Sequence, residues 1–223
     1  MKLPACIFDW DGVVVDSNAM HVKNWDRLAE EEGRPSPQVP NIGKCGLRTE
    51  AVLAKLLQWN VSPGDMDRLA FRKEELFRTM VAEEGIDSIR GVIHFLQALR
   101  SAGHPVAVGS SAPRLNVDAG IKALAMGDAF NAIVAGEDVA HGKPFPDIFL
   151  LAAKKMGVDP AHCVVFEDAP AGIQAAHAAG MRVIGVLSSH TAQELKQADM
   201  LIHHFGEMTP ERIIQWFPGL SEP

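Results

Sequence analysis

Six short apolar runs constrain this chain more than any other feature of its sequence. They are almost continuously apolar rather than alternating, which is typical of strands buried on both faces of a parallel sheet. Helical segments separate most of them, so the order of elements predicts an α/β fold with a doubly wound, mostly parallel sheet. The runs are ACIF (5–8), VAVG (106–109), AIVA (132–135), CVVF (163–166), RVIGVL (182–187) and MLI (200–202).

Two of the separating helices are well marked in the sequence. Residues 92–99 place apolar side chains on one face at helical spacing, and Gly103 follows them. Residues 170–179 begin with Pro170 and are followed by Gly180, the order that helix termini prefer. From residue 88 onward we therefore expect strands and helices to alternate.

The stretch between the first and second apolar runs breaks this alternation. It carries three helical patterns instead, and Ser62-Pro63-Gly64-Asp65 has the composition of a helix N-terminus. We expect a helical cap domain over residues 17–87, inserted into a core domain of residues 1–16 and 88–223. The three helical patterns cover about residues 19–33, 47–59 and 63–81.

The overall composition excludes several classes of protein. The net charge is −7 and no long basic run occurs, so we expect no nucleic-acid partner. No stretch approaches the ~18 consecutive apolar residues of a membrane span, and a charged motif by residue 9 leaves no room for a signal peptide. Three widely spaced cysteines, Cys6, Cys45 and Cys163, are typical of reduced thiols. We expect a cytoplasmic protein, monomeric or weakly dimeric.

The first strand leads directly into an acidic segment, FDWDGVVVDS (8–17). Asp9 and Asp11 would lie at the carboxyl end of this strand, where ligands bind in open α/β sheets, and Gly12 permits a sharp turn. Carboxylates this close repel one another unless a metal ion or a phosphoryl group uses them. The alternative is that both aspartates are ordinary turn residues.

Polar residues also follow the next three strands. Ser110 follows the second strand, Lys143 lies in the loop after the third, and Glu167 and Asp168 end the fourth. Each has an ordinary alternative: a helix N-cap, a surface lysine and a helix N-terminal charge pair. The four strand ends together are a more specific pattern than any one of them. They predict one crevice, with oxygen ligands that suit Mg²⁺. The crevice would hold Asp9, Asp11, Ser110, Lys143 and Asp168.

These segments resemble the four motifs of the haloacid dehalogenase-like superfamily of phosphotransferases. The resemblance rests on FDWDGVVVDS, the Ser110 strand end, GKPFPD and FEDAPAGIQAAHAAG, and it covers nearly the whole chain. It implies a Rossmann-like core with an inserted helical cap. Within the superfamily the chain is similar to the small-cap subfamily, which includes β-phosphoglucomutase and many small-metabolite phosphatases.

The resemblance also implies roles for the motif residues. Asp9 would be the nucleophile that forms an aspartyl-phosphate, and Asp11 would be the general acid and base. Ser110 and Lys143 would hold the phosphoryl oxygens. Mg²⁺ would be held by the Asp9 carboxylate, the Asp11 backbone carbonyl and Asp168, with Glu167 close by.

Asp11 separates this chain from two groups of relatives. Haloacid dehalogenases proper lack an aspartate two residues after the nucleophile. Phosphonoacetaldehyde hydrolases usually carry alanine there. The resemblance therefore implies phosphate-ester chemistry.

The cap is expected to select the substrate. His21 and Trp25 lie four residues apart on one helix face, and β-phosphoglucomutase has a similarly placed His and Trp and a lysine that matches Lys73. Arg48 lies at the start of the second cap helix. The alternatives are a packed or surface histidine, a tryptophan of the cap core, and solvated cations.

The second motif departs from the mutase pattern. The mutase has a Ser-x-Ser-Lys-Asn type sequence where this chain has Ser110-Ser111-Ala112-Pro113-Arg114, although Ser111 and Arg114 could still contact substrate. We therefore expect a Mg²⁺-dependent phosphatase of a small phosphorylated metabolite, with sugar phosphates as candidates. A β-phosphoglucomutase-type phosphotransferase is the alternative. A non-catalytic phospholigand-binding protein is disfavoured, because such proteins are expected to lose Asp9, Asp11 or Lys143.

Overall fold

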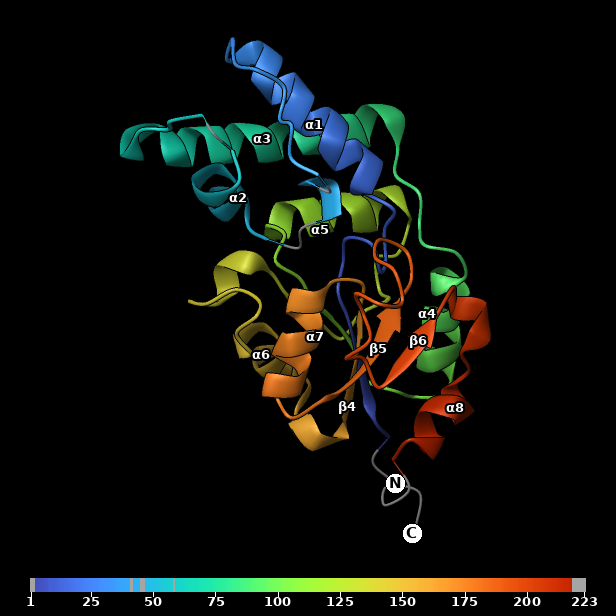
Figure 1. Cartoon of the computed structure of the whole chain (residues 1–223). Helices are drawn as coiled ribbons and strands as arrows, with labels where there is room; N and C mark the ends of the chain where they lie inside the picture. The colour runs from blue at the N-terminus through green and yellow to red at the C-terminus, as the bar shows by residue number, and fades with distance from the viewer. Residues whose placement is uncertain (1–2, 41, 45–46, 58, 218–223) are drawn as a thin grey trace.

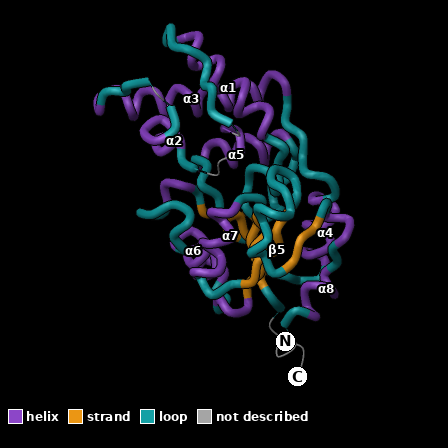
Figure 2. Tube along the Cα trace, in the orientation of Figure 1, coloured by secondary structure: helices purple, strands orange, loops and turns teal. Residues whose placement is uncertain are grey.

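A six-stranded sheet forms the centre of the computed structural model, which describes residues 3–40, 42–44, 47–57 and 59–217. All neighbouring strands are parallel, and their order is β3-β2-β1-β4-β5-β6. Figures 1 and 2 show the sheet in the lower part of the molecule, with helices on either side. The expected parallel α/β sheet is confirmed, and all six apolar runs form strands. The strands are β1 (Ala5–Phe8), β2 (Val106–Gly109), β3 (Ala132–Val134), β4 (Cys163–Glu167), β5 (Arg182–Val186) and β6 (Met200–Ile202).

The sheet is doubly wound around β1. The chain adds β2 and then β3 on one side of β1, and returns to place β4 on the other side. Register is continuous across the middle of the sheet, where Phe8 is the partner of both Val108 and Phe166. The carboxyl ends of β1, β2 and β4 therefore lie side by side.

Side chains of the strands alternate between two apolar layers. Ala5 and Ile7 pack in one cluster with helices α6 and α7, while Cys6 and Phe8 pack in the other with α4 and α8. The four core helices α4, α6, α7 and α8 thus cover both faces of the sheet, as a doubly wound fold requires. The helices of this part are α4 (Val92–Ser101), α5 (Arg114–Ala123), α6 (Asp147–Met156), α7 (Pro170–Ala178) and α8 (Pro210–Gln215), with short 3₁₀ turns η2 (Gly136–Asp138), η3 (Pro160–His162) and η4 (Phe205–Glu207).

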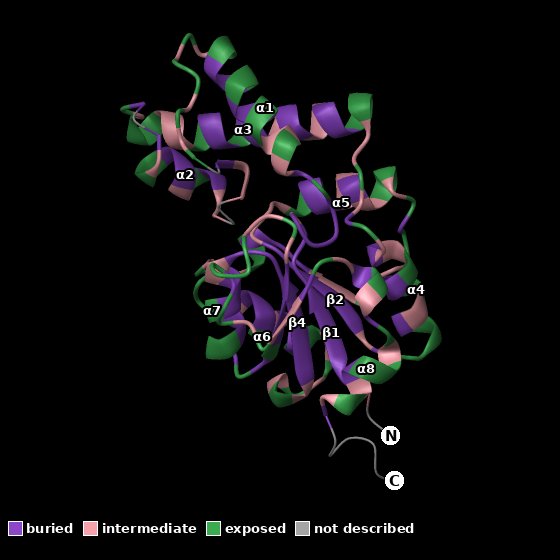
Figure 3. Cartoon of the chain, turned by 45° about the vertical axis from the view of Figure 1, so that its right-hand side comes forward, coloured by how far each residue is buried: buried purple, intermediate pink, exposed green. Residues whose placement is uncertain are grey.

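A second helical layer lies over the carboxyl ends of the strands (Figures 1 and 3). It consists of α1 (Asn18–Glu31), the 3₁₀ turn η1 (Ile42–Lys44), α2 (Thr49–Lys55) and α3 (Pro63–Glu84). These elements share their own apolar cluster, which includes Trp25, Leu28 and Leu69 and is separate from the clusters of the sheet. Below this layer, α3 lies against α5.

The two connections between the helical layer and the sheet run next to each other. The backbone N–H of Asp16 donates to the carbonyl of Asp87 at 2.8 Å, and that of Ile89 donates to Val14 at 3.0 Å. These bonds lie beside the expected boundaries at residues 16 and 88. The division into a core of 1–16 and 88–223 and a cap of 17–87 remains a prediction.

The second cap helix is shorter than its apolar spacing suggested. The pattern over 47–59 predicted a helix, but α2 ends at Lys55. Leu57 and Trp59 are buried in the cap cluster but are not helical. The apolar pattern at these two positions therefore indicates burial and not a helix. The third cap helix is longer than expected, because it continues to Glu84 and stops only at Gly85, whose φ is +77°.

Two of the three cysteines are buried free thiols, Cys6 and Cys163, and Cys45 lies outside the described residues. Within the described part of the chain, no helix is long and apolar enough to cross a membrane.

Candidate active site

The ends of β1, β2 and β4 and the loop after β3 bring five polar side chains together. Asp9 follows β1, Ser110 follows β2, and Glu167 and Asp168 stand at the end of β4; all four are buried. The Lys143 ammonium is buried between two of the carboxylates, with its Nζ 2.8 Å from Asp9 Oδ1 and 2.6 Å from Glu167 Oε1. The structure therefore brings Asp9, Ser110, Lys143 and Asp168 of the expected crevice to one edge of the sheet, together with Glu167, while the roles of these residues remain predictions.

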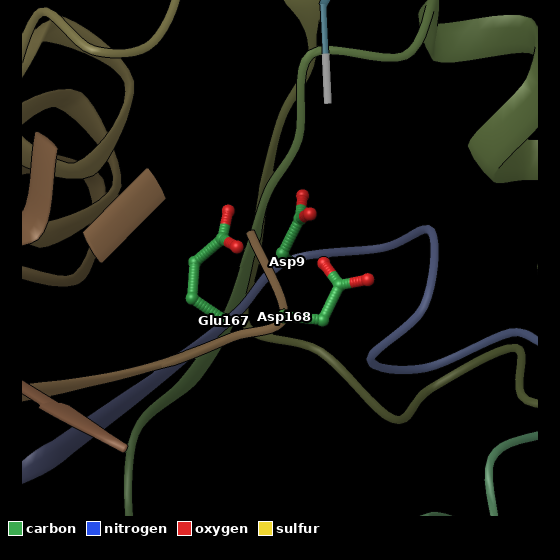
Figure 4. A group of neighbouring side chains, drawn as sticks. All are labelled: Asp9, Glu167 and Asp168. Atoms are coloured by element: carbon green, nitrogen blue, oxygen red, sulfur yellow. The ribbon is translucent and has the colours of Figure 1, made fainter. Parts of the chain in front are cut away.

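Three carboxylates at this edge converge on one point. Asp9, Glu167 and Asp168 each offer an oxygen within 4.8 Å of the other two, and Figure 4 shows the three side chains side by side with their carboxylates at the same end. Burial raises the pKa of Asp9 to about 7, because Glu167 adds to the effect of burial and Lys143 opposes it only in part. Burial raises the pKa of Asp168 well above its ordinary value, and the charges of Glu167 and Asp9 add to the effect.

This donor set fits a divalent metal ion. Its atoms are all carboxylate oxygens, the ligands that Mg²⁺ and other hard cations prefer. Burial, the largest cause of the raised pKa values of Asp9 and Asp168, disfavours their charged forms, and Lys143 offsets this only in part. Asp9, Glu167 and Asp168 could therefore hold such an ion, in line with the expected metal ligands.

Two glycines make room for the carboxylates. A Cβ atom on Gly12, whose φ is +76°, would lie 1.9 Å from Asp168 Oδ2. A Cβ atom on Gly172 would lie 1.8 Å from Glu167 Oε1. Neither distance is compatible with a side chain, so the glycines of FDWDG and APAG allow the cluster to form.

Asp11 is turned toward the cap instead of the acidic cluster. Its Oδ1 accepts a hydrogen bond from Ser17 Oγ at 2.6 Å and lies 3.2 Å from His21 Nε2. Burial would raise the pKa of Asp11, but His21, Ser17 and the charge of Lys73 together hold it below its ordinary value. Asp9 and Asp11 thus have opposite pKa shifts, a pattern found where two carboxylates have different tasks.

Lys73 sets the tautomer of the cap histidine. Lys73 Nζ lies 3.2 Å from His21 Nδ1, and an ammonium group can only donate. His21 Nδ1 must therefore accept, so the proton is on Nε2, which donates to Asp11. The imidazole also stacks on Phe77, with ring centroids 4.5 Å apart.

One cavity opens between the cap and the strand ends. Ser110 and Ser111 line it from the core, and Trp25, Arg48 and Lys73 line it from the cap. Trp25 is also buried in the cap's apolar cluster, as its alternative interpretation held. Arg48 crosses to the core, where its guanidinium donates to the carbonyl of Val139 at 2.9 Å.

Arg114 is the one expected substrate contact that does not line this cavity. Its Nε donates to Asp118 Oδ1 at 2.8 Å on the exposed side of α5, and its backbone N–H donates to Glu137. Arg114 lies in the first turn of α5, and its side chain is directed to Asp118, four residues further along the helix. A substrate-binding role for Arg114 has no support in this arrangement.

Several cavity residues were not anticipated from the sequence. The most notable is Glu74, a buried carboxylate of α3 that contacts Thr49 of α2 and Asn116 of α5. The available signal was its spacing: Ala70, Lys73, Glu74 and Phe77 fall on one face of a helix, and that face is buried. The other unanticipated lining residues are Asn18, Ile42, Gly43, Lys44, Leu47, Thr49, Val52, Ala112, Pro113 and Asn116.

Comparisons with known proteins agree with this geometry. A family model described as haloacid dehalogenase-like hydrolase matches residues 3–180. The chain is 32% identical over 206 residues to the chloroplastic 5-amino-6-(5-phospho-D-ribitylamino)uracil phosphatase of Arabidopsis thaliana, covering 91% of this chain but only 55% of that protein. It is 36% identical over 182 residues to fructose-1-phosphate phosphatase YqaB of Escherichia coli K12, covering 81% of this chain and 94% of that protein.

The same similarity is seen in three dimensions. The structure matches β-phosphoglucomutase from Clostridium difficile with a TM-score of 0.83 and 25% sequence identity, covering 98% of each chain. The match therefore includes the helical layer as well as the sheet.

Proposed function

The chain belongs to the haloacid dehalogenase-like hydrolase family, and from this premise we propose that it is a phosphatase of a small phosphorylated metabolite that works through an aspartyl-phosphate. The observation that carries the proposal is the pairing of two carboxylates at the end of β1. Asp9 is buried against Lys143, while Asp11 faces the cap and the cavity. This is the arrangement that a nucleophile and a separate acid–base group require.

In the first step an Asp9 oxygen attacks phosphorus, and the bond from phosphorus to the leaving oxygen breaks. Asp11 gives that oxygen its proton, so the alcohol leaves neutral. The entering phosphate places negative charge next to Asp11, which raises its pKa toward the protonated form that this step needs. Lys143 and the Ser110 hydroxyl bind phosphoryl oxygens and stabilise the charge that develops on them.

In the second step water attacks the aspartyl-phosphate and Asp11 accepts a proton from it. The bond between phosphorus and the Asp9 oxygen breaks, which releases inorganic phosphate and restores the carboxylate. Asp11 is left ionised by the first step, so its carboxylate can accept this proton, and its contacts with Ser17 and His21 hold it in position. The same group thus returns to the protonated state for the next cycle.

A divalent ion, which we propose to be Mg²⁺, would be held by Asp9, Glu167 and Asp168. When bound, it supplies positive charge that lets an anionic nucleophile approach an anionic phosphate. Lys143 contributes one positive charge to the same end and is itself held by Asp9 and Glu167.

Relatives suggest the size of the substrate. The phosphatases described above act, by name, on a phosphorylated ribityl compound and on fructose 1-phosphate. We infer that this chain acts on a phosphate ester of a similar small, hydroxyl-bearing metabolite.

A mutase of the β-phosphoglucomutase type is the second candidate, favoured by the structural match to such an enzyme. Against it stand Ala112 and Pro113, which replace polar residues of the mutase's second motif. The outward side chain of Arg114 adds to this difference.

The test is phosphate release from a panel of phosphorylated sugars, polyols and nucleotide precursors with Mg²⁺, with Asp9→Asn as the blank. β-Glucose 1-phosphate is run beside a coupled glucose 6-phosphate readout. Rapid phosphate release from one ester supports the phosphatase. Formation of glucose 6-phosphate with little free phosphate would favour the mutase, and no turnover of any ester would contradict both.

A further inference from the structure

Glu74 places a buried negative charge in the cap wall of the cavity. Its Oε1 accepts hydrogen bonds from Lys73 Nζ at 3.0 Å and from Thr49 Oγ1, and its Oε2 accepts one from Asn116 Nδ2. Arg78 in turn donates to Asn116 Oδ1 at 2.9 Å. The carboxylate therefore bonds to two elements of the cap and to α5 of the core.

This carboxylate is ionised in its buried position. Burial alone would raise the pKa of Glu74, but the charge of Lys73 and the Thr49 hydrogen bond outweigh it and hold the pKa below its ordinary value. Three donors occupy its two oxygens, and a carboxylate has about four acceptor positions. One position therefore remains for another donor, such as a substrate hydroxyl.

Glu74 lies on the side of the cavity where the leaving group belongs. A row of contacts connects Asp11 with Glu74. Asp11 Oδ1 lies 3.2 Å from His21 Nε2, and the other ring nitrogen of His21 lies 3.2 Å from Lys73, which contacts Glu74. Since Asp11 is the group proposed to protonate the leaving oxygen, the rest of the leaving alcohol extends toward this wall. Glu74 and Asp11 line the same cavity.

The charge of Glu74 changes what this wall can bind. Lys44, Arg48 and Lys73 are cations that line the cavity from the cap, and without the charge of Glu74 they would favour a second phosphate group there. With Glu74 in contact, Lys73 is paired and nearly inaccessible, with a side chain 5% exposed. A phosphate placed here would meet a fixed like charge out of contact with bulk water, and like charges in such positions disfavour binding.

We propose that Glu74 is a specificity-determining residue that restricts the leaving group to an uncharged, hydroxyl-bearing alcohol and excludes sugar bisphosphates. The proposal rests on the proposed phosphatase function and narrows its substrate class to monophosphates.

The test compares a monophosphate with its bisphosphate in the absence of turnover. Dissociation constants for fructose 1-phosphate and fructose 1,6-bisphosphate are measured by calorimetry with Mg²⁺ on the Asp9→Asn protein, with and without Glu74→Gln. With Glu74 present, the monophosphate should bind more tightly. Glu74→Gln should improve bisphosphate binding at least about tenfold and change monophosphate binding less than about threefold.

Glu75→Gln is the matched control. Glu75 is the next residue of α3 and carries the same charge, but it pairs with Arg72 on the outer side of the helix and does not line the cavity. Its substitution should change neither constant. If it changes the ratio as much as Glu74→Gln, the effect is one of general charge and the proposal fails.

The outcomes separate this proposal from the proposed function. Tighter binding of the bisphosphate with Glu74 present, or an unchanged ratio in Glu74→Gln, overturns the role of Glu74 even if the wild-type protein releases phosphate from esters. Absence of phosphate release from every ester overturns the phosphatase, whatever the binding ratio. If Glu74→Gln does not fold, as judged by circular dichroism, the ratio with Glu74 present decides alone.

Discussion

The edge of the sheet and the wall of the cap form the two halves of one cavity, and they are built in different ways. At the sheet edge, Asp9, Ser110 and Asp168 follow directly from strand ends that lie side by side. In the cap, Arg48 lies directly before α2 and Glu74 lies on α3. The two side chains line the same cavity only because these helices pack together. Under the proposed function, the sheet would position the catalytic groups and the separately packed helical layer would select the substrate.

The two halves also differ in how their charge is compensated. The sheet edge buries three carboxylates around Lys143, and the pKa values of Asp9 and Asp168 are raised as a result. In the cap, Lys73 pairs with Glu74, and Arg72 pairs with Glu31 and Glu75. The sheet edge therefore carries an excess of negative charge that a cation would compensate, whereas in the cap Lys73 and Glu74 compensate each other.

Asp9→Asn should have the largest effect on activity. The amide cannot act as the nucleophile, so kcat should fall by at least about 10³-fold. One negative charge is removed from a crowded buried cluster, so the melting temperature should not fall. Phosphate release and thermal unfolding check both points, and appreciable turnover would show that another group is the nucleophile.

Lys143→Met should have the largest effect on stability. Removing the ammonium leaves Asp9 and Glu167 buried without their partner, and breaking such a pair costs about 3–5 kcal/mol. Urea unfolding measures the loss. The control is Lys154→Met on the exposed side of α6, which should change the free energy of unfolding little. Equal losses in the two variants would mean that Lys143 is not the centre of the cluster.

Mg²⁺ should stabilise the protein more at high pH than at low pH. The pKa of Asp9 is about 7 in the folded protein against 3.8 as its ordinary value, and the pKa of Asp168 is also raised. The folded metal-free protein therefore holds protons that the unfolded chain releases, so its stability falls as pH rises from about 4 to about 7. A bound cation removes this loss.

Thermal unfolding with and without Mg²⁺ measures this effect. The shift in melting temperature should be clearly larger at about pH 8 than at about pH 5. Asp168→Asn serves as the control and should reduce the shift. A shift that is the same at both pH values would contradict a metal site built on these carboxylates.

Lys73→Ala should show how far the cap participates in the chemistry. It removes the donor to His21 Nδ1, so the imidazole is no longer held in the tautomer that donates to Asp11. We expect kcat/KM to fall on the order of 10- to 100-fold, with kcat contributing to the loss. Arg72→Ala, on the outer side of the same helix, should change it less than about twofold. If the two variants behave alike, Lys73 is only a structural cation.

Arg114→Ala should have the smallest effect. The side chain lies outside the cavity and pairs with Asp118 at half-exposed positions, an interaction worth about 0.5 kcal/mol or less. We expect kcat/KM to stay within about twofold of the wild type. A tenfold rise in KM for the identified substrate would show that Arg114 turns inward when substrate binds.

The sheet and the residues at its edge could be predicted from the sequence alone. Short apolar runs gave the six strands because a strand buried on both faces must be apolar throughout. Backbone hydrogen bonds then align the ends of parallel strands. A polar residue just after a strand therefore lies at the carboxyl edge of the sheet, however the helices pack against it. Asp9, Ser110 and Asp168 could be grouped for this reason.

Which side chains form the cap wall of the cavity depends on tertiary packing and could not be predicted from the sequence. The contacts of Glu74 with Thr49 and Asn116 join segments of α2, α3 and α5, and nothing local in the sequence ties these together. The direction of Arg114 and the early end of α2 depend on packing in the same way. A helix can pack at several angles and rotations, so the positions of its side chains follow from distant contacts that a one-dimensional pattern does not contain.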